Sequence, residues 1–235
     1  METEKEWAAD QERQAMDRRA AKRRLVAISE TREPWFDPAA DRAAGGLIFL
    51  DFDGVLHPLG EGASSFSQAD LLMEAILAIE ESSGAAVAIA LVTSWRFQPM
   101  ASIKEALSAA APGLGERVEG RSGSMLGEQF SGGCRLAECL DYLAKRPGGA
   151  PAWHCALDDQ PSIFERPAAA GSQERLGPPA WLIACDSNIG IDARAKDWIK
   201  EAGRLALAGE WPPESPLGKR RGGAPTWVAT QRSRL

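Results

Sequence analysis

The sequence is poor in the residues that build disulfide frameworks, zinc sites and membrane spans. Its 235 residues include four cysteines and two histidines, with no CxxC pair and no histidine at zinc-ligand spacing. Its longest apolar runs, such as the one ending at Leu50, are far too short to cross a bilayer. The first residues lack the basic and apolar segments of a secretory signal. We therefore expect a reduced, cytoplasmic protein without a membrane partner.

The chain also lacks an excess of positive charge: 27 Lys and Arg stand against 33 Asp and Glu, and the formal net charge is −6. Nucleic-acid binding needs clustered Lys and Arg that neutralise phosphates, so this balance does not indicate a nucleic-acid partner. Residues 216–235 are the exception, because they hold no acidic residue and five basic ones: Lys219, Arg220, Arg221, Arg232 and Arg234. We interpret this end as a solvated tail, and strand binding through it stays an alternative.

The distribution of Gly and Pro divides the chain into three regions. Residues 1–30 contain neither and are rich in Ala, Glu, Arg and Lys, which predicts a charged helix. Residues 32–46, with two prolines and a Gly pair, are typical of a linker. We expect this helix and linker over residues 1–45, one organised domain over 46–208, and a Pro/Gly/Arg-rich tail over 209–235.

Apolar runs alternate with helical patterns through the organised domain. The runs predict buried strands at residues 47–50, 85–92, 117–119, 152–157 and 181–185. Composition and spacing predict helices near residues 71–79, 100–110, 135–145 and 192–201. The alternation indicates an α/β fold, a three-layer open parallel sheet with helices on both faces. Residues 55–84 hold little more than one helix, and the Gly/Ser-rich stretch 120–133 is loop-sized, so we expect little or no cap domain.

Polar residues follow three of the predicted strands where each ends. Asp51 and Asp53 follow the first, Thr93 the second, and Asp158 with Asp159 the fourth. The carboxyl ends of parallel strands meet at one edge of the sheet, where such folds bind ligands. Two pairs of carboxylates at one edge repel each other, and a divalent cation with oxygen ligands relieves that repulsion. These residues therefore predict a Mg²⁺ site.

The segments around these residues resemble the motifs of one enzyme superfamily. The sequence LIFLDFDGVLHP resembles the first motif of the haloacid dehalogenase (HAD)-like phosphohydrolases, ALVTSWR the second and ALDDQ the fourth. More narrowly, the chain resembles a group of small bacterial phosphatase-like proteins that lack a cap and are related to HAD domains of RNA-repair proteins. The resemblance covers about residues 46–203. It implies a Rossmann-like HAD fold and a Mg²⁺-dependent phosphomonoesterase.

The resemblance also implies roles for single residues. Asp51 would be the nucleophile that forms an aspartyl-phosphate, and Asp53 the general acid and base. Thr93 would hydrogen-bond a phosphoryl oxygen, with Ser94 and the turn residue Gly54 beside the substrate. Trp95 would either stack on a substrate ring or simply pack.

The third motif of the superfamily usually supplies a Lys that offsets phosphoryl charge. Arg135, at the start of a predicted helix, matches that position best here, and Lys145 at the far end is the alternative. The implied Mg²⁺ ligands are the carboxylates of Asp51 and Asp158, that of Asp159 directly or through water, and the backbone carbonyl of Asp53.

Each signal also has an interpretation without catalysis. The Asp51-x-Asp53 pair fits an exposed turn or the start of a calcium loop, Thr93 a helix cap, and Asp158-Asp159 a surface turn. His57 fits either a residue that lines the pocket or, as we favour, a plain loop histidine, and His154 a structural residue inside a strand.

Three functional hypotheses stay open at this point. The first is an active Mg²⁺-dependent phosphomonoesterase acting on a phosphorylated small molecule or macromolecule. The second is a HAD-like binding or regulatory protein with weak turnover, which the missing Lys motivates. The third is a phosphatase that processes nucleic-acid ends, with the basic tail holding the strand.

Overall fold

The computed structural model describes residues 34–40, 45–60, 64–123, 134–167 and 175–210. Three predicted features lie outside these residues: the charged helix at 1–30, most of the Gly/Ser-rich stretch, at 124–133, and nearly all of the tail, at 211–235. Every helix in the described part of the chain is too short or too polar to span a bilayer.

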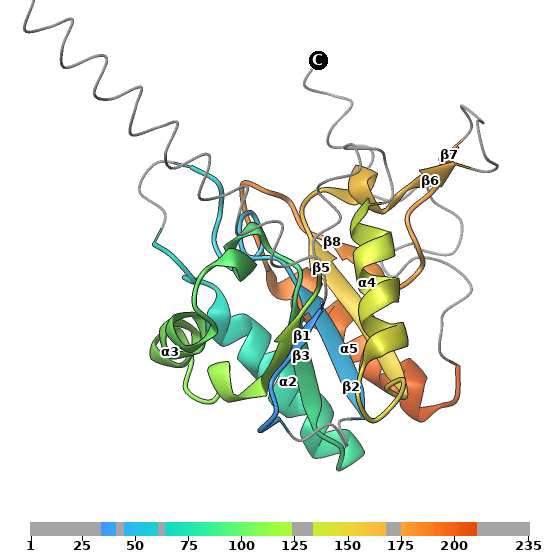
Figure 1. The fold of residues 1–235 in the computed structure, drawn as a ribbon, viewed down its shortest axis with the longest axis horizontal. Helices are drawn as coiled ribbons and strands as arrows, with labels where there is room; N and C mark the ends of the chain where they lie inside the picture. The colour runs from blue at the N-terminus through green and yellow to red at the C-terminus, as the bar shows by residue number, and fades with distance from the viewer. Residues whose placement is uncertain (1–33, 41–44, 61–63, 124–133, 168–174, 211–235) are drawn as a thin grey trace, which may run out of the picture.

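A six-stranded sheet forms the centre of the molecule (Figure 1). Its strands are β1 (Trp35–Phe36), β2 (Gly46–Leu50), β3 (Val87–Leu91), β4 (Val118–Arg121), β5 (Trp153–Asp158) and β8 (Leu182–Ala184). They lie in the order β1-β4-β3-β2-β5-β8, and every neighbouring pair is parallel except β1 with β4. A separate antiparallel pair joins β6 (Arg166–Pro167) to β7 (Arg175–Leu176).

Helices cover both faces of the sheet. They are α2 (Ala69–Ser83), α3 (Met100–Ala110), α4 (Cys134–Lys145) and α5 (Ala193–Leu207). Residues of α2, α3 and α5 pack in one buried cluster with Ile48 and Leu50, whereas α4 packs in a second cluster with Leu47 and Phe49. Figure 1 shows α4 in front of the sheet and α2 behind it. The predicted three-layer α/β architecture is confirmed.

The central strand β2 explains why the first apolar run is continuous. All five of its residues are buried, because it has parallel neighbours on both sides and helices on both faces. Alternation sends Leu47 and Phe49 toward one helical layer and Ile48 and Leu50 toward the other. Phe49 packs edge-on against Tyr142 of α4 at 5.7 Å between ring centroids. Truncating such a core aromatic to Ala costs about 3–5 kcal/mol.

The register of the parallel strands brings their polar ends together. Leu50 of β2 pairs with Leu91 of β3 on one side and with Leu157 of β5 on the other. The residues that follow these three leucines therefore emerge at the same level of one sheet edge. In the described part of the chain, α2 and loop residues are all that connect β2 to β3. The described residues of this connection therefore form no cap domain.

The structure differs from the sequence prediction at the ends of the sheet. The predicted linker contains β1, which pairs with β4 through Phe36 and Gly120. A Cβ on Gly120 would lie 2.4 Å from the carbonyl oxygen of Trp35, so glycine allows this edge strand to approach. Helix α5 continues to Leu207 rather than ending near residue 201. Its Gly203 lies against Ile79 of α2, which explains a glycine inside that helix.

Candidate active site

Three aspartates at the carboxyl end of the sheet form a cluster of carboxylates. Asp51 follows β2, Asp158 is the last residue of β5, and Asp159 comes next. One carboxylate oxygen from each lies within 4.8 Å of the other two. Asp51 and Asp158 are buried, and Asp159 is half-buried. The two predicted strand ends therefore meet in one site.

Burial makes the charged form of these carboxyl groups costly. Burial is the largest cause of a raised pKa at Asp51, Asp158 and Asp159. The pKa of Asp158 is raised to about 8 and that of Asp159 to about 6. The charge of Asp51 raises the pKa of the other two further. Arg135 opposes the rise at Asp51 and Asp158. The cluster thus favours binding a positive charge.

The donors of this cluster fit a hard divalent cation. Among the described residues, Oδ2 of Asp158 and Oδ1 of Asp159 are buried and have no hydrogen-bond partner. A buried carboxylate oxygen that accepts no hydrogen bond has lost its hydration, and a cation can replace it; at Asp158 the guanidinium of Arg135 offsets part of this loss. An all-oxygen donor set favours Mg²⁺ over softer metals. The residues present therefore fit the predicted Mg²⁺ ion.

Gly54 shapes the turn that separates the two aspartates of the first motif from the next loop. Its φ of 72° lies in the left-handed region, as the predicted sharp turn requires. Its N–H donates to the carbonyl of His57 at 2.9 Å. A Cβ on Gly54 would lie 2.5 Å from Oδ2 of Asp159. Glycine therefore allows both the turn and the close approach of a candidate metal ligand.

Arg135 is the basic residue that the structure brings to the cluster. Its Nε lies 3.5 Å from Oδ2 of Asp158, and the side chain is 13% exposed. Burial alone would lower the pKa of Arg135, but attraction to Asp158, Asp51 and Glu138 outweighs it and raises that pKa. Its Nη1 is buried without a hydrogen-bond partner among the described residues. Lys145 lies at the other end of α4 and pairs with Asp141 at 3.0 Å.

A second layer of buried charge supports Arg135, and the sequence analysis missed it. Glu138 lies one turn along α4, with Oε2 3.9 Å from Nε of Arg135. Its Oε1 accepts a hydrogen bond from Nη2 of Arg96 at 2.9 Å, and Nη1 of Arg96 donates to the carbonyl of Val92 at 2.7 Å. Arg96 and Glu138 are nearly fully buried. The available signals were the i, i+3 spacing of Arg135 and Glu138 and the place of Arg96 within ALVTSWR.

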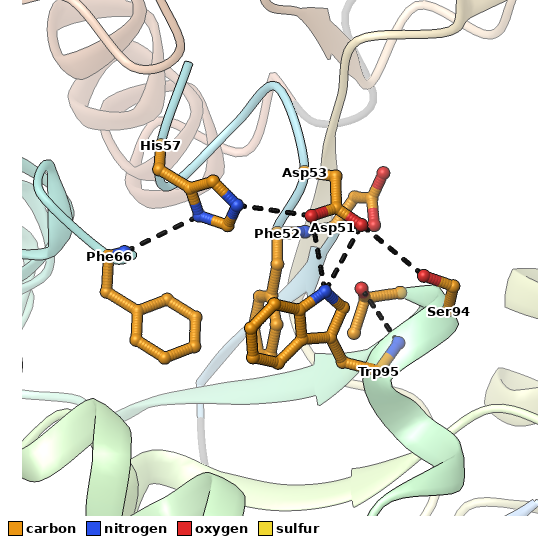
Figure 2. A network of polar contacts seen from close by, with 8 residues as sticks. Asp51, Phe52, Asp53, His57, Phe66, Ser94 and Trp95 are labelled. Carbon is orange, nitrogen blue, oxygen red and sulfur yellow. Dashed lines mark hydrogen bonds and ion pairs between the residues drawn. The ribbon is translucent and has the colours of Figure 1, made fainter. Parts of the chain in front are cut away.

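Asp53 faces a different environment from Asp51 (Figure 2). Its side chain is 40% exposed and is not part of the three-aspartate cluster. It contacts Nε2 of His57 at 3.1 Å, Nε1 of Trp95 at 3.2 Å and Oγ of Ser94 at 3.4 Å. The two aspartates of the first motif thus lie in different environments. Asp51 belongs to the carboxylate cluster that favours a bound cation, whereas the carboxylate of Asp53 is held by hydrogen bonds. Metal binding through the backbone carbonyl of Asp53 stays a prediction.

Thr93 lies between these two environments. It is fully buried, and its Oγ1 accepts a hydrogen bond from the N–H of Trp95 at 3.2 Å, capping the short helix η1 (Ser94–Phe97). A hydrogen bond from its hydroxyl also acts to lower the pKa of Asp51. The cap and the contact with Asp51 are therefore both present. Ser94 is exposed beside it.

The two histidines and Trp95 occupy places that the sequence described only in part. His57, read as a plain loop histidine, is buried and touches Asp53. Trp95 packs among aromatic rings and points its indole N–H at the same carboxylate. His154 packs edge-on against Phe49 and Trp181, and burial lowers its pKa to about 4, in keeping with a structural role.

Comparisons with known proteins place this site in a family. Residues 47–195, more than half of the chain, match the family described as the HAD domain in Swiss Army Knife RNA repair proteins. The matched segment contains all three motifs quoted above and every candidate site residue. Comparisons with curated proteins and with solved structures gave no match.

Proposed function

Because the chain belongs to the family of HAD domains in Swiss Army Knife RNA repair proteins, we propose that it hydrolyses phosphomonoesters with Mg²⁺ and through an aspartyl-phosphate. Membership of the family implies a hydrolase of the phosphatase type. The observation that supports the finer proposal is the environment of Asp51, which lies buried among Asp158, Asp159 and Arg135. Three acidic groups and one buried guanidinium suit a transferring phosphoryl group and its cation.

In the first half-reaction, a carboxylate oxygen of Asp51 attacks phosphorus and forms a new P–O bond. The bond from phosphorus to the ester oxygen breaks, and that oxygen takes the proton carried by the carboxyl group of Asp53. The alcohol leaves neutral, and Asp53 is left as a carboxylate. Arg135 and the hydroxyl of Thr93 offset charge on the nucleophile and on the phosphoryl oxygens.

In the second half-reaction, Asp53 takes a proton from a water molecule as its oxygen attacks phosphorus. The P–O bond to Asp51 breaks, so Asp51 returns to a carboxylate and inorganic phosphate is released. Asp53 is protonated again for the next cycle. A bound Mg²⁺, held by Asp51, Asp158 and Asp159, would neutralise charge on the nucleophile and the phosphoryl group.

The test is phosphate release from 4-nitrophenyl phosphate with Mg²⁺ and with EDTA. We expect turnover of the wild-type protein to require Mg²⁺ and Asp51→Asn to abolish it, since an amide is a poor nucleophile. Asp141→Asn on the outer part of α4 is the matched control, because Asp141 pairs with Lys145 rather than with the cluster. Unchanged turnover in Asp51→Asn would contradict the mechanism. No turnover of any substrate would favour a binding or regulatory role.

A phosphorylated nucleic-acid end is the second candidate substrate. The family description names RNA repair, and the part of the chain that is described has no cap over the site, which suits a bulky substrate. We propose testing removal of terminal phosphate from short RNA and DNA strands at several salt concentrations. If the basic segment 216–235 holds the strand, its deletion weakens binding and flattens the salt dependence. Salt-independent cleavage that survives the deletion would exclude this use of the tail.

The cellular location is proposed as the reduced cytoplasm. Cys139, Cys155 and Cys185 are buried and free. Burial raises the pKa of the Cys155 thiol to about 12, so it behaves as a small apolar group rather than as a nucleophile.

A further inference from the structure

The carboxylate of Asp53 is held by three side chains from two segments of the chain (Figure 2). His57 comes from the same loop, whereas Ser94 and Trp95 come from η1 after β3. If Asp53 is the acid and base of the proposed function, these contacts decide where its proton lies. The inference that follows rests on that proposed function and concerns the residues that orient Asp53.

The two oxygens of Asp53 have unequal partners. Oδ1 lies 3.1 Å from Nε2 of His57 and 3.2 Å from Nε1 of Trp95. Oδ2 lies 3.2 Å from the same indole nitrogen and 3.4 Å from Oγ of Ser94. The indole N–H can only donate, whereas a serine hydroxyl can donate or accept. The indole N–H therefore favours neither oxygen, and the two differ in their second partner: Oδ1 faces His57, whereas Oδ2 faces a hydroxyl that can donate or accept.

The neighbouring backbone sets the proton position on His57. Nδ1 of His57 lies 3.4 Å from the backbone N–H of Phe66, which can only donate. Nδ1 is therefore the acceptor in the neutral ring, and Nε2 carries the hydrogen that points at Oδ1 of Asp53. The contact between His57 and Asp53 is thus a donated hydrogen bond that does not need a charged imidazole.

Aromatic packing holds both donors in place. The Trp95 ring lies 5.4 Å from Phe66 and 5.9 Å from Phe52 between centroids, and the His57 ring lies 5.9 Å from Phe66. Phe52 and Phe66 are buried. Phe66 adopts a φ of 59°, in the left-handed region that a phenylalanine rarely takes. The loop keeps this unusual conformation where the Phe66 ring meets both donors and its N–H meets His57.

We propose that Trp95 and His57 are positioning residues of Asp53: Trp95, at the same distance from both oxygens, fixes the carboxyl group in place, and His57 holds Oδ1 as an acceptor, so that Oδ2 transfers the proton. With Nε2 of His57 donating to Oδ1, the acidic hydrogen resides on Oδ2, from which it passes to the leaving oxygen as the P–O bond breaks. The same Oδ2 takes the proton back from water. Ser94 donates to Oδ2 while Asp53 is ionised and accepts from it while Asp53 is protonated.

This arrangement matters most for substrates whose leaving group is a strong base. An alkoxide must be protonated as it departs, whereas a nitrophenolate is a stable anion and needs little help. The test is therefore kcat/KM for a series of aryl phosphates of graded leaving-group basicity and for ethyl phosphate. This quantity reports the steps up to formation of the aspartyl-phosphate, so slow hydrolysis of that intermediate does not affect it.

The main variant is Trp95→Phe, which removes the indole N–H and keeps an aromatic ring against Phe52 and Phe66. We expect kcat/KM for ethyl phosphate to fall about 30–100-fold and that for 4-nitrophenyl phosphate less than about threefold, because loss of a positioning residue should cost less than the roughly 10²–10⁴-fold of general acid catalysis itself. The control is Trp198→Phe on α5, which makes the same chemical change beside the main core cluster. It should leave kcat/KM unchanged for both substrates. His57→Phe should also steepen the dependence on leaving-group basicity, and His57→Gln, which retains a donor, should restore part of it.

Asp53→Asn separates the possible failures. Asp53→Asn should steepen the dependence of kcat/KM on leaving-group basicity. If the double variant Asp53→Asn with Trp95→Phe then shows no steeper dependence than Asp53→Asn alone, the two residues act through one carboxyl group, as proposed. If Asp53→Asn steepens it and Trp95→Phe lowers all substrates equally, Trp95 is only structural and the inference is overturned. If Asp53→Asn leaves the dependence unchanged, Asp53 is not the acid, and that part of the proposed function fails.

Discussion

Removing the divalent cation should make the stability of this protein fall as pH rises through neutrality. The reason is Asp158, whose pKa burial raises to about 8 in the folded protein. Between its unfolded value near 4 and about 8, the folded state binds more protons than the unfolded state, so the free energy of unfolding decreases with increasing pH. Burial also raises the pKa of Asp159, but only to about 6, so Asp159 contributes little above pH 6.5.

The magnitude follows from linkage. Each pH unit inside the window costs about 1.4 kcal/mol for one proton, so the loss between pH 6.5 and pH 8 is on the order of 1–2 kcal/mol for Asp158. For a domain of this size that lowers Tm by roughly 2–8 °C. His154, whose pKa burial lowers to about 4, acts in the opposite sense, but because its unfolded pKa is near 6.5 it returns less than about 0.5 kcal/mol above pH 6.5. A bound cation replaces the protons, so Mg²⁺ should raise Tm more at pH 8 than at pH 6.5.

The assay is thermal unfolding in EDTA and in Mg²⁺ at several pH values between 6.5 and 8. Asp158→Asn is the informative control, because it keeps the shape and removes the titration. It should flatten the pH dependence in EDTA and reduce the stabilisation by Mg²⁺. A Tm in EDTA that stays constant or rises across this range in the wild-type protein would refute the reasoning.

Three further predictions address single residues of the site. Arg135→Ala should lower kcat about 10²–10³-fold by removing a buried charge from the phosphoryl site, whereas Lys145→Ala should leave the steady-state rate unchanged. Glu138→Gln should lower the free energy of unfolding in urea by about 3 kcal/mol, since it removes the anion that pairs with the buried Arg96 and one of the anions near Arg135. A loss below about 1 kcal/mol would contradict this. Gly54→Ala should weaken Mg²⁺ binding in calorimetry, because its Cβ would lie 2.5 Å from Oδ2 of Asp159; unchanged affinity would show that the loop adapts.

The fold could be predicted from the sequence where burial imposes a pattern. β2 is buried on both faces, so its apolar run is continuous, and the strand was predicted to within one residue. β1 was not predicted, because two residues between two prolines are too few to show a period. Its pairing with β4 depends on Gly120 and on contact between Phe36 and Tyr142, which are distant in the sequence.

The residues of the site also differ in whether the sequence alone could predict them. Asp51 and the Asp158-Asp159 pair could be predicted, because each follows a recognisable strand and the register of a parallel sheet aligns the strand ends. Glu138 could not, because its function depends on α4 facing the sheet at one rotation, which brings it between Arg135 and Arg96. The sequence gives the periodicity of a helix but not the partner that its polar side chains will meet.

Asp51 and Asp53 have identical side chains in one motif, but the structure places them in different chemical environments. Two residues along the chain are enough to carry the second carboxyl group out of the buried cluster, where Asp51 lies with two more carboxyls and a guanidinium. Asp53 instead meets an indole, an imidazole and a hydroxyl, all able to hydrogen-bond without carrying charge. A group surrounded by charges is suited to hold a cation and attack phosphorus, whereas one surrounded by neutral donors can exchange a proton without losing its place. If Asp51 is the nucleophile and Asp53 the acid and base, as proposed, then Arg135 sets the first role and Trp95 and His57 the second through the contacts they make.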